Sequence, residues 1–280
     1  CACLVGSEMC IRDSYYLAYQ LLFIFLATGT DATIALIGGA DITANFRPGT
    51  MAISIGMLLS ALAMTWHLVH FHYVKFNKES MYEVSKKIIL LCIPLLLSAQ
   101  FIAGILNEAL DLTDTNQELF ISMSHNIFGV LSIAIVVPIL EEVLFRGAIE
   151  GHLLRKGWSP KWAILVSALI FGIIHGNPAQ IPFAFLIGLL FGWLYYRTGS
   201  LVPGIVGHII NNSFGAWTMF TATREELSQT TMETLGTTIT YILLVLAIIV
   251  FIGMYLYLNK YLPKPTNIQV KAINEQDITI

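Results

Sequence analysis

The chain has 280 residues, of which 56% are hydrophobic and only 12% are charged, and its mean hydropathy is +0.73. Soluble domains carry about 25% charged residues, so this composition excludes an ordinary soluble domain and predicts an integral membrane protein in contact with membrane lipid. The net charge of -3 and the lack of a long basic run exclude nucleic acid as a partner.

Apolar blocks of about 20 residues recur along the chain, which is the length that a helix needs to cross a hydrocarbon core about 30 Å thick. The alternating pattern of transmembrane barrels is absent. We therefore predict an all-α fold, a polytopic transmembrane helical bundle of about eight spans with a polar intramembrane cavity. The predicted spans lie near residues 15–40, 51–74, 87–107, 120–151, 161–176, 181–197, 201–221 and 238–259.

The two ends of the chain differ from this apolar body. Residues 1–14 do not begin with methionine and resemble a non-native read-through end, so we expect them to lie outside the fold or to be disordered. Residues 15–260 form the predicted transmembrane domain, whose functional core spans about 120–220. Residues 261–280 are polar and predict a cytoplasmic tail.

Positive charge collects in alternate loops of the predicted bundle. The loop at 108–119 carries acidic residues and no Lys or Arg. By the positive-inside rule, this asymmetry predicts a multi-pass membrane protein with both termini in the cytoplasm. We expect the membrane to be a bacterial plasma membrane. The basic residues that follow the second, fourth and eighth spans are Lys75, Lys78, Lys86, Lys87, Arg155, Lys156, Lys161, Lys260 and Lys264.

The fourth span is anomalous because it holds ionisable residues, which cost at least ~2.5–3.5 kcal/mol each at the centre of a spanning helix. Glu142 and Arg146 share one helix face and are predicted to form a structural ion pair. Glu141 is rotated by about 100° from Glu142 and has no such partner, so it can face a cavity. Pro138 removes a backbone hydrogen bond one turn earlier and can bend the helix.

Two later spans carry histidine. His175 ends the fifth span, and His208 lies in the seventh span with Asn212 on the same helix face. At about 1.5 Å per residue from the nearest basic residue, Glu141 and His175 lie about 21 Å deep, and His208 lies at most about 16 Å deep. These side chains can therefore meet in one cavity near mid-membrane, which we expect to be reachable from the cytoplasm.

This combination of side chains predicts hydrolysis. A carboxylate and a neutral imidazole can activate a shared water molecule, and a second histidine with an asparagine amide can stabilise an oxyanion. Glu141, His175 and His208 also resemble a zinc set of two histidines and one glutamate, although no His-Glu-x-x-His motif occurs. His208 cannot bind zinc and donate to an oxyanion at once, and Asn212 is a poor zinc ligand, so we favour a reaction without metal or other cofactor.

Three motifs in this order resemble the CPBP family of intramembrane proteases, also called the CAAX-protease and bacteriocin-processing or ABI family. They are Glu-Glu-x-x-x-Arg at 141–146, Phe-x-x-x-His at 171–175 and His-x-x-x-Asn at 208–212. The resemblance covers about 140–215 and implies an endopeptidase that acts on a membrane-associated protein or peptide. The implied processes are CAAX-type cleavage, bacteriocin or leader processing, and immunity.

The resemblance also implies a role for each polar residue. Glu141 would act as the general base and His175 would hold the attacking water, while His208 and Asn212 would form the oxyanion hole. The catalytic set is then Glu141, Glu142, His175, His208 and Asn212. Glu142 and Arg146 would form the structural pair. Glu150 departs from the family pattern and could compete with Glu142 for Arg146.

Two alternatives from other classes stay open. A proton- or ion-coupled transporter would use Glu141, Glu142 and His175 as a proton relay, although the chain lacks clear inverted repeats. A catalytically idle immunity or scaffold protein of the same fold would carry the same motifs.

Overall fold

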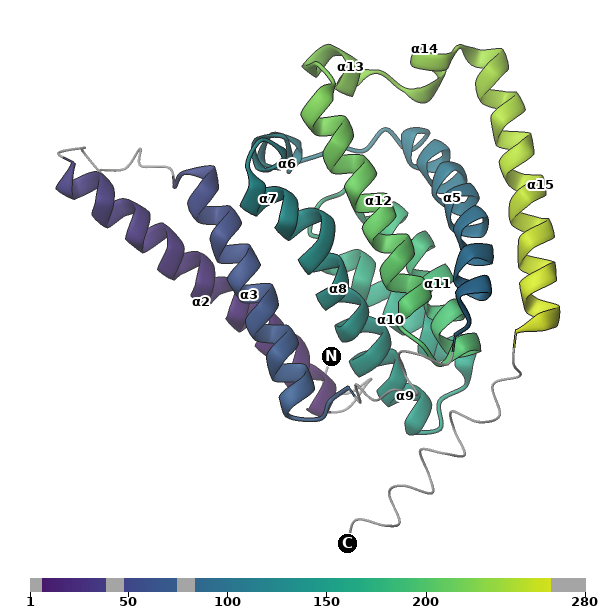
Figure 1. Cartoon of the computed structure of the whole chain (residues 1–280), viewed down its shortest axis with the longest axis horizontal. Coiled ribbons are helices and arrows are strands. Elements are labelled where there is room, and N and C mark those ends of the chain that lie inside the picture. The colour runs from purple at the N-terminus through teal and green to yellow at the C-terminus, as the bar shows by residue number, and fades with distance from the viewer. Residues whose placement is uncertain (1–6, 39–47, 75–83, 263–280) are drawn as a thin grey trace, which may run out of the picture.

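The computed structural model describes residues 7–38, 48–74 and 84–262, and every regular element in these ranges is a helix (Figure 1). Between residues 127 and 155, short α-helical pieces alternate with two π-helical segments without a break. The elements are α2 (Ser7–Ile37), α3 (Thr50–His70), α5 (Lys86–Glu108), α6 (Gln117–Ser124), α7 (Ile127–Leu131), η1 (Ser132–Val136), α8 (Val137–Glu141), η2 (Glu142–Glu150), α9 (Gly151–Arg155), α10 (Pro160–Ile174), α11 (Ile181–Thr198), α12 (Val202–Thr221), α13 (Arg224–Ser228), α14 (Thr231–Leu235) and α15 (Thr237–Tyr261).

The predicted all-α transmembrane bundle is confirmed. Each predicted span overlaps one helix or helical run. Within the described ranges, six helical runs are long and apolar enough to cross a membrane, and α10 is apolar but shorter. The total of eight spans therefore stays a prediction. The six are Ala18–Ile37, Thr50–His70, Lys86–Glu108, Ile127–Arg155, Ile181–Thr198 and Thr237–Tyr261.

The first helix begins before the predicted domain does. α2 starts at Ser7, so residues 7–14, which we expected outside the fold, form its first turns. No proline or glycine interrupts the sequence between Ser7 and Thr28, and a helix has no local reason to end there. Residues 1–6 and nearly all of the predicted tail, 263–280, lie outside the described residues.

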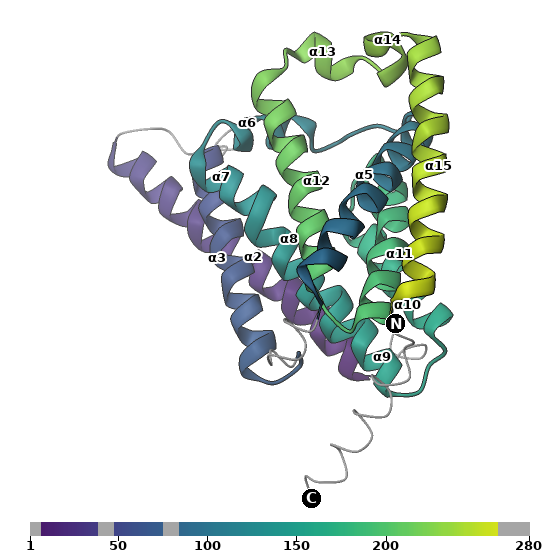
Figure 2. The same ribbon diagram turned by 45° about the vertical axis from the view of Figure 1, so that its right-hand side comes forward.

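The helical run of α8 and η2 lies at the centre of the bundle. It contacts α3, α10, α11 and α12, and all nine residues of η2 are buried. α2 and α15 lie on opposite flanks (Figures 1 and 2). Both expose large apolar side chains, such as Phe25 and Ile37 on α2 and Ile249 and Leu256 on α15, which is the surface that lipid would cover.

The two ends of the bundle differ in charge. The loop at 108–116 lies at the same end as α13 and α14, whereas α9 lies at the opposite end (Figure 1). Thr231 donates to Glu108 through its backbone N–H at 3.0 Å, and Asn177 Nδ2 donates to Asp114 at 2.7 Å. These bonds join residues 108–116, 175–180 and 222–236 into what we call the acidic end, and residues 152–161 form the basic end.

Thiol labelling tests the orientation of these two ends. In a version without the four native cysteines, Thr113→Cys and Lys156→Cys each introduce one exposed thiol, at the acidic and the basic end respectively. The positive-inside rule predicts that an impermeant maleimide added to intact cells labels Thr113→Cys and spares Lys156→Cys. Both thiols should react after lysis, and the reverse pattern in intact cells would place the acidic end in the cytoplasm.

Candidate active site

The helix that carries the two glutamates changes its hydrogen-bond pattern at the candidate site. The π-helical segments η1 and η2 flank the short α8, which ends at Glu141. A π-helix bonds each N–H to the carbonyl five residues earlier, and such segments are frequent at functional sites. Because a π-helical turn holds more residues, consecutive side chains diverge by less than the about 100° of an α-helix. Glu141 and Glu142 stand at this junction.

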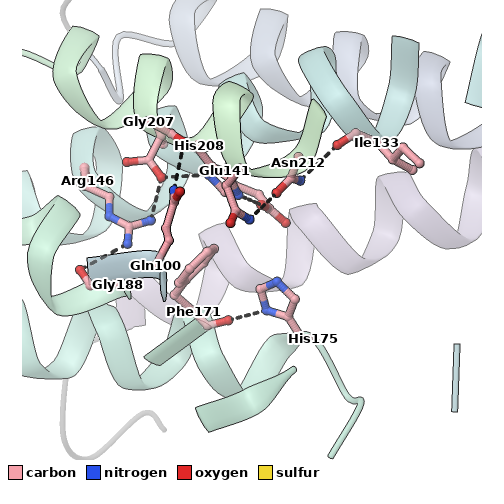
Figure 3. Close-up of polar contacts among 12 residues, drawn as sticks. Gln100, Ile133, Glu141, Arg146, Phe171, His175, Gly188, Gly207, His208 and Asn212 are labelled. Atoms are coloured by element: carbon pink, nitrogen blue, oxygen red, sulfur yellow. Dashed lines mark hydrogen bonds and ion pairs between the residues drawn. The ribbon is translucent and has the colours of Figure 1, made fainter. Parts of the chain in front are cut away.

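The first π-helical segment has a cause in the sequence. The Val137 N–H donates to the carbonyl of Ser132, five residues earlier. The same register would direct the next N–H to Ile133, but residue 138 is proline and has no N–H. Asn212 of α12 supplies a donor instead, since its Nδ2 donates to the Ile133 carbonyl at 2.9 Å (Figure 3). Asn212 therefore ties α12 to the helix that carries the glutamates.

Glu142 and Arg146 form an ion pair that the protein encloses. Arg146 Nη1 lies 2.9 Å from Glu142 Oε1, and both side chains are at most 1% exposed. Arg146 Nη2 donates to the carbonyl of Gly188 on α11 at 3.2 Å (Figure 3). The guanidinium also lies 4.4 Å from the centroid of the Phe171 ring on α10. Neither charge of the pair faces lipid.

His208 lies between the two glutamates. Its Nδ1 donates to Glu142 Oε1 at 3.0 Å, and its Nε2 lies 3.4 Å from Glu141 Oε2. His208 is 5% exposed and Glu141 is 7% exposed. One imidazole therefore joins both carboxylates, an arrangement that the sequence motifs did not indicate.

His175 is placed apart from this cluster. It follows the last residue of α10, and its Nδ1 donates to the carbonyl of Phe171 at 2.7 Å (Figure 3). In the described structure it makes no hydrogen bond or ion pair with Glu141 or His208. The Phe171 ring contacts both imidazoles, with centroids 5.0 Å from that of His175 and 5.8 Å from that of His208. Both histidines line one cavity, so they share that space without touching.

Glycines let α12 approach its neighbours near His208. A Cβ on Gly204 would lie 2.6 Å from Glu142 Oε2, and one on Gly207 would lie 2.5 Å from a leucine of α5. Gln100 of α5 also donates to the Gly207 carbonyl at 3.2 Å (Figure 3). The sequence motifs did not indicate Gly204 or Gln100. Small residues three or four positions from an intramembrane histidine are a signal that could have found the glycine.

A cavity of about 530 Å³ extends from this cluster. Around Glu141 and His208 its wall is buried, with Phe171 and Phe191 among the lining residues. Partly exposed residues of the acidic end, of the adjoining α6 and of the last turn of α12 also line it, whereas no lining residue comes from the basic end. Those partly exposed residues are Asn116, Leu119, Phe120, Gln180 and Met219. This lining supports access from the acidic end. It does not support the expected access from the cytoplasm if the acidic end lies outside, as the charge pattern predicts.

Glu150 is buried but takes no part in the site. Neither of its carboxyl oxygens has a hydrogen-bond partner, and the described structure contains no ion pair between Glu150 and Arg146. Gly192 of α11 leaves room for it, since a Cβ there would lie 2.6 Å from Glu150 Oε2. Glu150 does not line the cavity, and Arg146 pairs with Glu142 instead.

The zinc set considered from the sequence is not assembled. The described residues contain no group of three or more His, Cys, Asp or Glu side chains that could hold a metal ion. Glu141 and His208 are neighbours, but the Phe171 ring lies between the imidazoles of His175 and His208. The residues present therefore do not fit a zinc ion with three protein ligands.

These features define a polytopic helical membrane protein with a cluster of carboxylates and imidazole at the inner end of a cavity. The family model described as "Type II CAAX prenyl endopeptidase Rce1-like" matches residues 123–214, the part that carries the whole cluster. This segment is similar to the CAAX-protease family of membrane proteases, the resemblance that the three motifs indicated.

Three bacterial proteins are similar to parts of the chain. The membrane peptidase candidate YdiL of Bacillus subtilis is 38% identical over 81 residues, which is 29% of this chain and 33% of YdiL. The membrane-embedded CAAX protease MroQ of Staphylococcus aureus is 33% identical over 106 residues, 36% of this chain and 42% of MroQ. The UPF0177 protein YxdF of Lactococcus lactis is 28% identical over 122 residues, 43% of this chain and 63% of YxdF. The chain thus spans less than two thirds of each relative, and no solved structure matches it significantly.

Removal of the arginine tests how well the ion pair is buried. Arg146→Ala should destabilise the protein by about 3–5 kcal/mol, because it leaves the Glu142 charge buried without its partner. The matched control is Arg224→Ala, which removes a pair with Glu118 whose side chains are 72% and 67% exposed, and should cost about 0–1 kcal/mol. Thermal unfolding in detergent, followed by tryptophan fluorescence, measures both. Equal small shifts would contradict the buried pair.

A double substitution tests whether Asn212 replaces the N–H that Pro138 lacks. Asn212→Leu should lower stability by about 1–3 kcal/mol, because the Ile133 carbonyl loses a donor. Pro138→Ala restores a backbone N–H, so adding it to Asn212→Leu should recover part of this loss. The unfolding temperatures of the parent, both single variants and the double variant measure the coupling. Additive effects of the two substitutions would show that they act independently.

Proposed function

We propose that this protein is an intramembrane endopeptidase in which Glu141 activates water to cleave a peptide bond. The observation that carries the proposal is the position of His208, 3.0 Å from Glu142 and 3.4 Å from Glu141, beside a cavity of about 530 Å³. A carboxylate and an imidazole beside a cavity of this size meet the needs of general-base hydrolysis. The family match supports the same activity.

The hydrogen bonds assign most of the protons in the site. Carboxylate and carbonyl oxygens can only accept hydrogen bonds, so His208 Nδ1 carries a proton toward Glu142 and His175 Nδ1 carries one toward Phe171. The Nε2 of a neutral His175 is then an acceptor that can hold a water molecule. His208 Nε2 and Glu141 share one proton, because two unprotonated acceptors 3.4 Å apart would repel each other.

This shared proton makes the cluster electrically neutral. Glu142 and Arg146 cancel, and Glu141 and His208 together carry no net charge when one proton lies between them. Neutrality limits the cost of placing four ionisable groups inside a membrane. A protonated His208 is also a stronger hydrogen-bond donor than a neutral ring. The cluster therefore combines a base with a donor for developing negative charge.

In the proposed reaction, a water molecule held by Glu141 and His175 attacks the carbonyl carbon of the peptide bond. Glu141 takes a proton from the water as the new C–O bond forms. The carbonyl oxygen becomes an oxyanion, which accepts hydrogen bonds from His208 Nε2 and from the second N–H of Asn212. Glu141 then gives its proton to the leaving nitrogen as the C–N bond breaks. The products are a carboxylic acid and an amine, and Glu141 is again a carboxylate.

Glu142 contributes to this reaction through His208. Arg146 fixes Glu142, and Glu142 holds the Nδ1 side of the His208 ring, which directs Nε2 toward Glu141. We therefore assign Glu142 as a positioning residue, and we reserve contact with the reacting atoms for Glu141, His175, His208 and Asn212. No metal or other cofactor takes part in this scheme.

The family resemblance and the relatives support a substrate class and a location for the protein. The printed name of MroQ supports a CAAX-type peptide as one substrate class, and bacteriocin or leader peptides are others that the family motifs imply. The three relatives come from bacteria, which supports a bacterial plasma membrane, and the basic residues in alternate loops support a cytoplasmic position of both termini. The substrate would be a membrane-associated protein or peptide that enters the cavity.

Glu141→Gln tests the proposed base. It preserves the shape of the side chain but removes the proton acceptor, so the rate of proteolysis should fall on the order of 10²–10⁴-fold with normal accumulation in membranes. Purified protein in lipid nanodiscs, incubated with internally quenched peptides, gives the rate by fluorescence and the cleavage site by mass spectrometry. Glu225→Gln is the matched control, since Glu225 is exposed and lies outside the cavity.

Two results of this assay would contradict the proposed mechanism. Full activity of Glu141→Gln would remove Glu141 from the reaction. Loss of parental activity to a chelator, restored by zinc and accompanied by stoichiometric bound zinc, would require a metal and recast His208 as a ligand. Cleavage that Glu225→Gln retains, Glu141→Gln loses and chelator leaves unchanged is the expected outcome.

A further inference from the structure

The polar lining of the cavity has an unusual composition. Apart from Glu141 and the two histidines, every polar lining residue carries a side-chain amide, and the remaining lining residues are apolar side chains or glycine. No Lys, Arg, Asp, Ser or Thr of the described residues lines the cavity. The amide residues are Gln20, Asn116, Gln180, Asn211 and Asn212.

Such a wall matches the main chain of a peptide. Each side-chain amide offers a donor and an acceptor without charge, which is the same pair of groups that a peptide bond presents. Away from Glu141 and the two histidines, a charged side chain would find no opposite charge along this wall, and burying it there would cost several kcal/mol. The wall therefore favours a neutral ligand that can exchange N–H and C=O hydrogen bonds.

Two of the amides keep hydrogen-bonding groups for a ligand. Gln180 makes no hydrogen bond through its side chain in the described structure, although it precedes α11 at a capping position. Asn211 uses one N–H on Asn212 Oδ1 at 3.0 Å, which leaves its oxygen and its second N–H. Asn212 is held at both ends, by Asn211 and by the Ile133 carbonyl. Gln180 belongs to the acidic end, whereas Asn211 adjoins the cluster.

We propose that Gln180 and Asn211 bind the main chain of an extended, uncharged peptide segment whose apolar side chains contact the apolar wall. The segment must be extended, because a helix already uses its N–H and C=O groups internally. The inference rests on the proposed function in that it takes the cavity as the substrate site. Binding does not require cleavage, however, so the two can be tested separately.

Binding to Glu141→Gln protein in nanodiscs tests the inference without turnover. The probes are fluorescent octapeptides of Ala, Leu and Val, the same peptides with one central Lys or Glu, and versions with one central amide replaced by an ester. Microscale thermophoresis gives each Kd. We expect a central charge to raise Kd at least about tenfold. An ester, which lacks the N–H, should raise Kd about threefold to tenfold at the positions that Gln180 or Asn211 contacts.

Substitution of the amides identifies the residues responsible. Gln180→Met should raise Kd about threefold to tenfold and abolish the ester effect at one peptide position. Asn211→Leu should do the same at a different position. Gln229→Met is the matched control, because Gln229 is an exposed amide outside the cavity, and its Kd values should equal those of the Glu141→Gln background.

Each outcome decides between the two proposals. Equal affinity for charged and uncharged peptides, no binding of any peptide, or the same Kd for Gln180→Met and Gln229→Met would overturn the inference. Selective binding that depends on Gln180, combined with no cleavage of any bound peptide by the parent protein, would uphold the inference and overturn the endopeptidase proposal.

Discussion

Burial of the Glu142 and Arg146 charges inside the membrane shapes the centre of this molecule. Each charge needs partners that lipid cannot offer, and each partner comes from a different helix. Arg146 takes the Gly188 carbonyl of α11 and the face of Phe171 on α10. Glu142 takes His208 of α12. The ion pair thereby gathers three helices around η2 and fixes the histidine that we assign to the reaction.

The π-helical hydrogen-bond register is the second constraint on the centre of the molecule. Like the ion pair, it is satisfied by groups from neighbouring helices. Where the helix departs from α-helical bonding, side chains of neighbouring helices donate to its carbonyls. Asn212 of α12 donates to Ile133 in η1, and Ser167 of α10 donates to Phe145 in η2 at 2.9 Å. In a medium without water, such donors replace what solvent would supply. The bonds that satisfy the irregular helix therefore also align α10 and α12 with it.

The fold could be predicted from the sequence because a hydrocarbon core imposes a length on every apolar block. The candidate residues could be found because ionisable side chains stand out in apolar helices, as Glu141, Arg146 and His208 do. The π-helices could not be predicted, since a change of hydrogen-bond register leaves the apolar character of a buried helix unchanged. The position of His208 between two carboxylates was also missed, because spacing along one helix says nothing of which side chains meet across helices.

Depth counting placed Glu141, His175 and His208 in one cavity, which the structure bears out, but it could not indicate the end from which that cavity opens. It measures distance along a helix, whereas access depends on which end the surrounding helices leave open. α10 has 15 residues, so it rises about 22 Å and ends short of a hydrocarbon core about 30 Å thick. We therefore expect the polar turn after His175, where Asn177 bonds to Asp114 at the acidic end, to lie below the membrane surface.

Because the partly exposed residues that line the cavity lie toward the acidic end and none belongs to the basic end, we propose that water and peptide reach Glu141 from the acidic end. In the orientation that the positive-inside rule predicts, the route starts at the outer face of the membrane. A peptide that is exported or already inserted in the membrane can reach it there, whereas a soluble cytoplasmic tail cannot. In the opposite orientation the route starts in the cytoplasm, and a soluble cytoplasmic tail can reach it. The side on which the acidic end lies therefore decides the origin of the substrate before any residue of the peptide is considered.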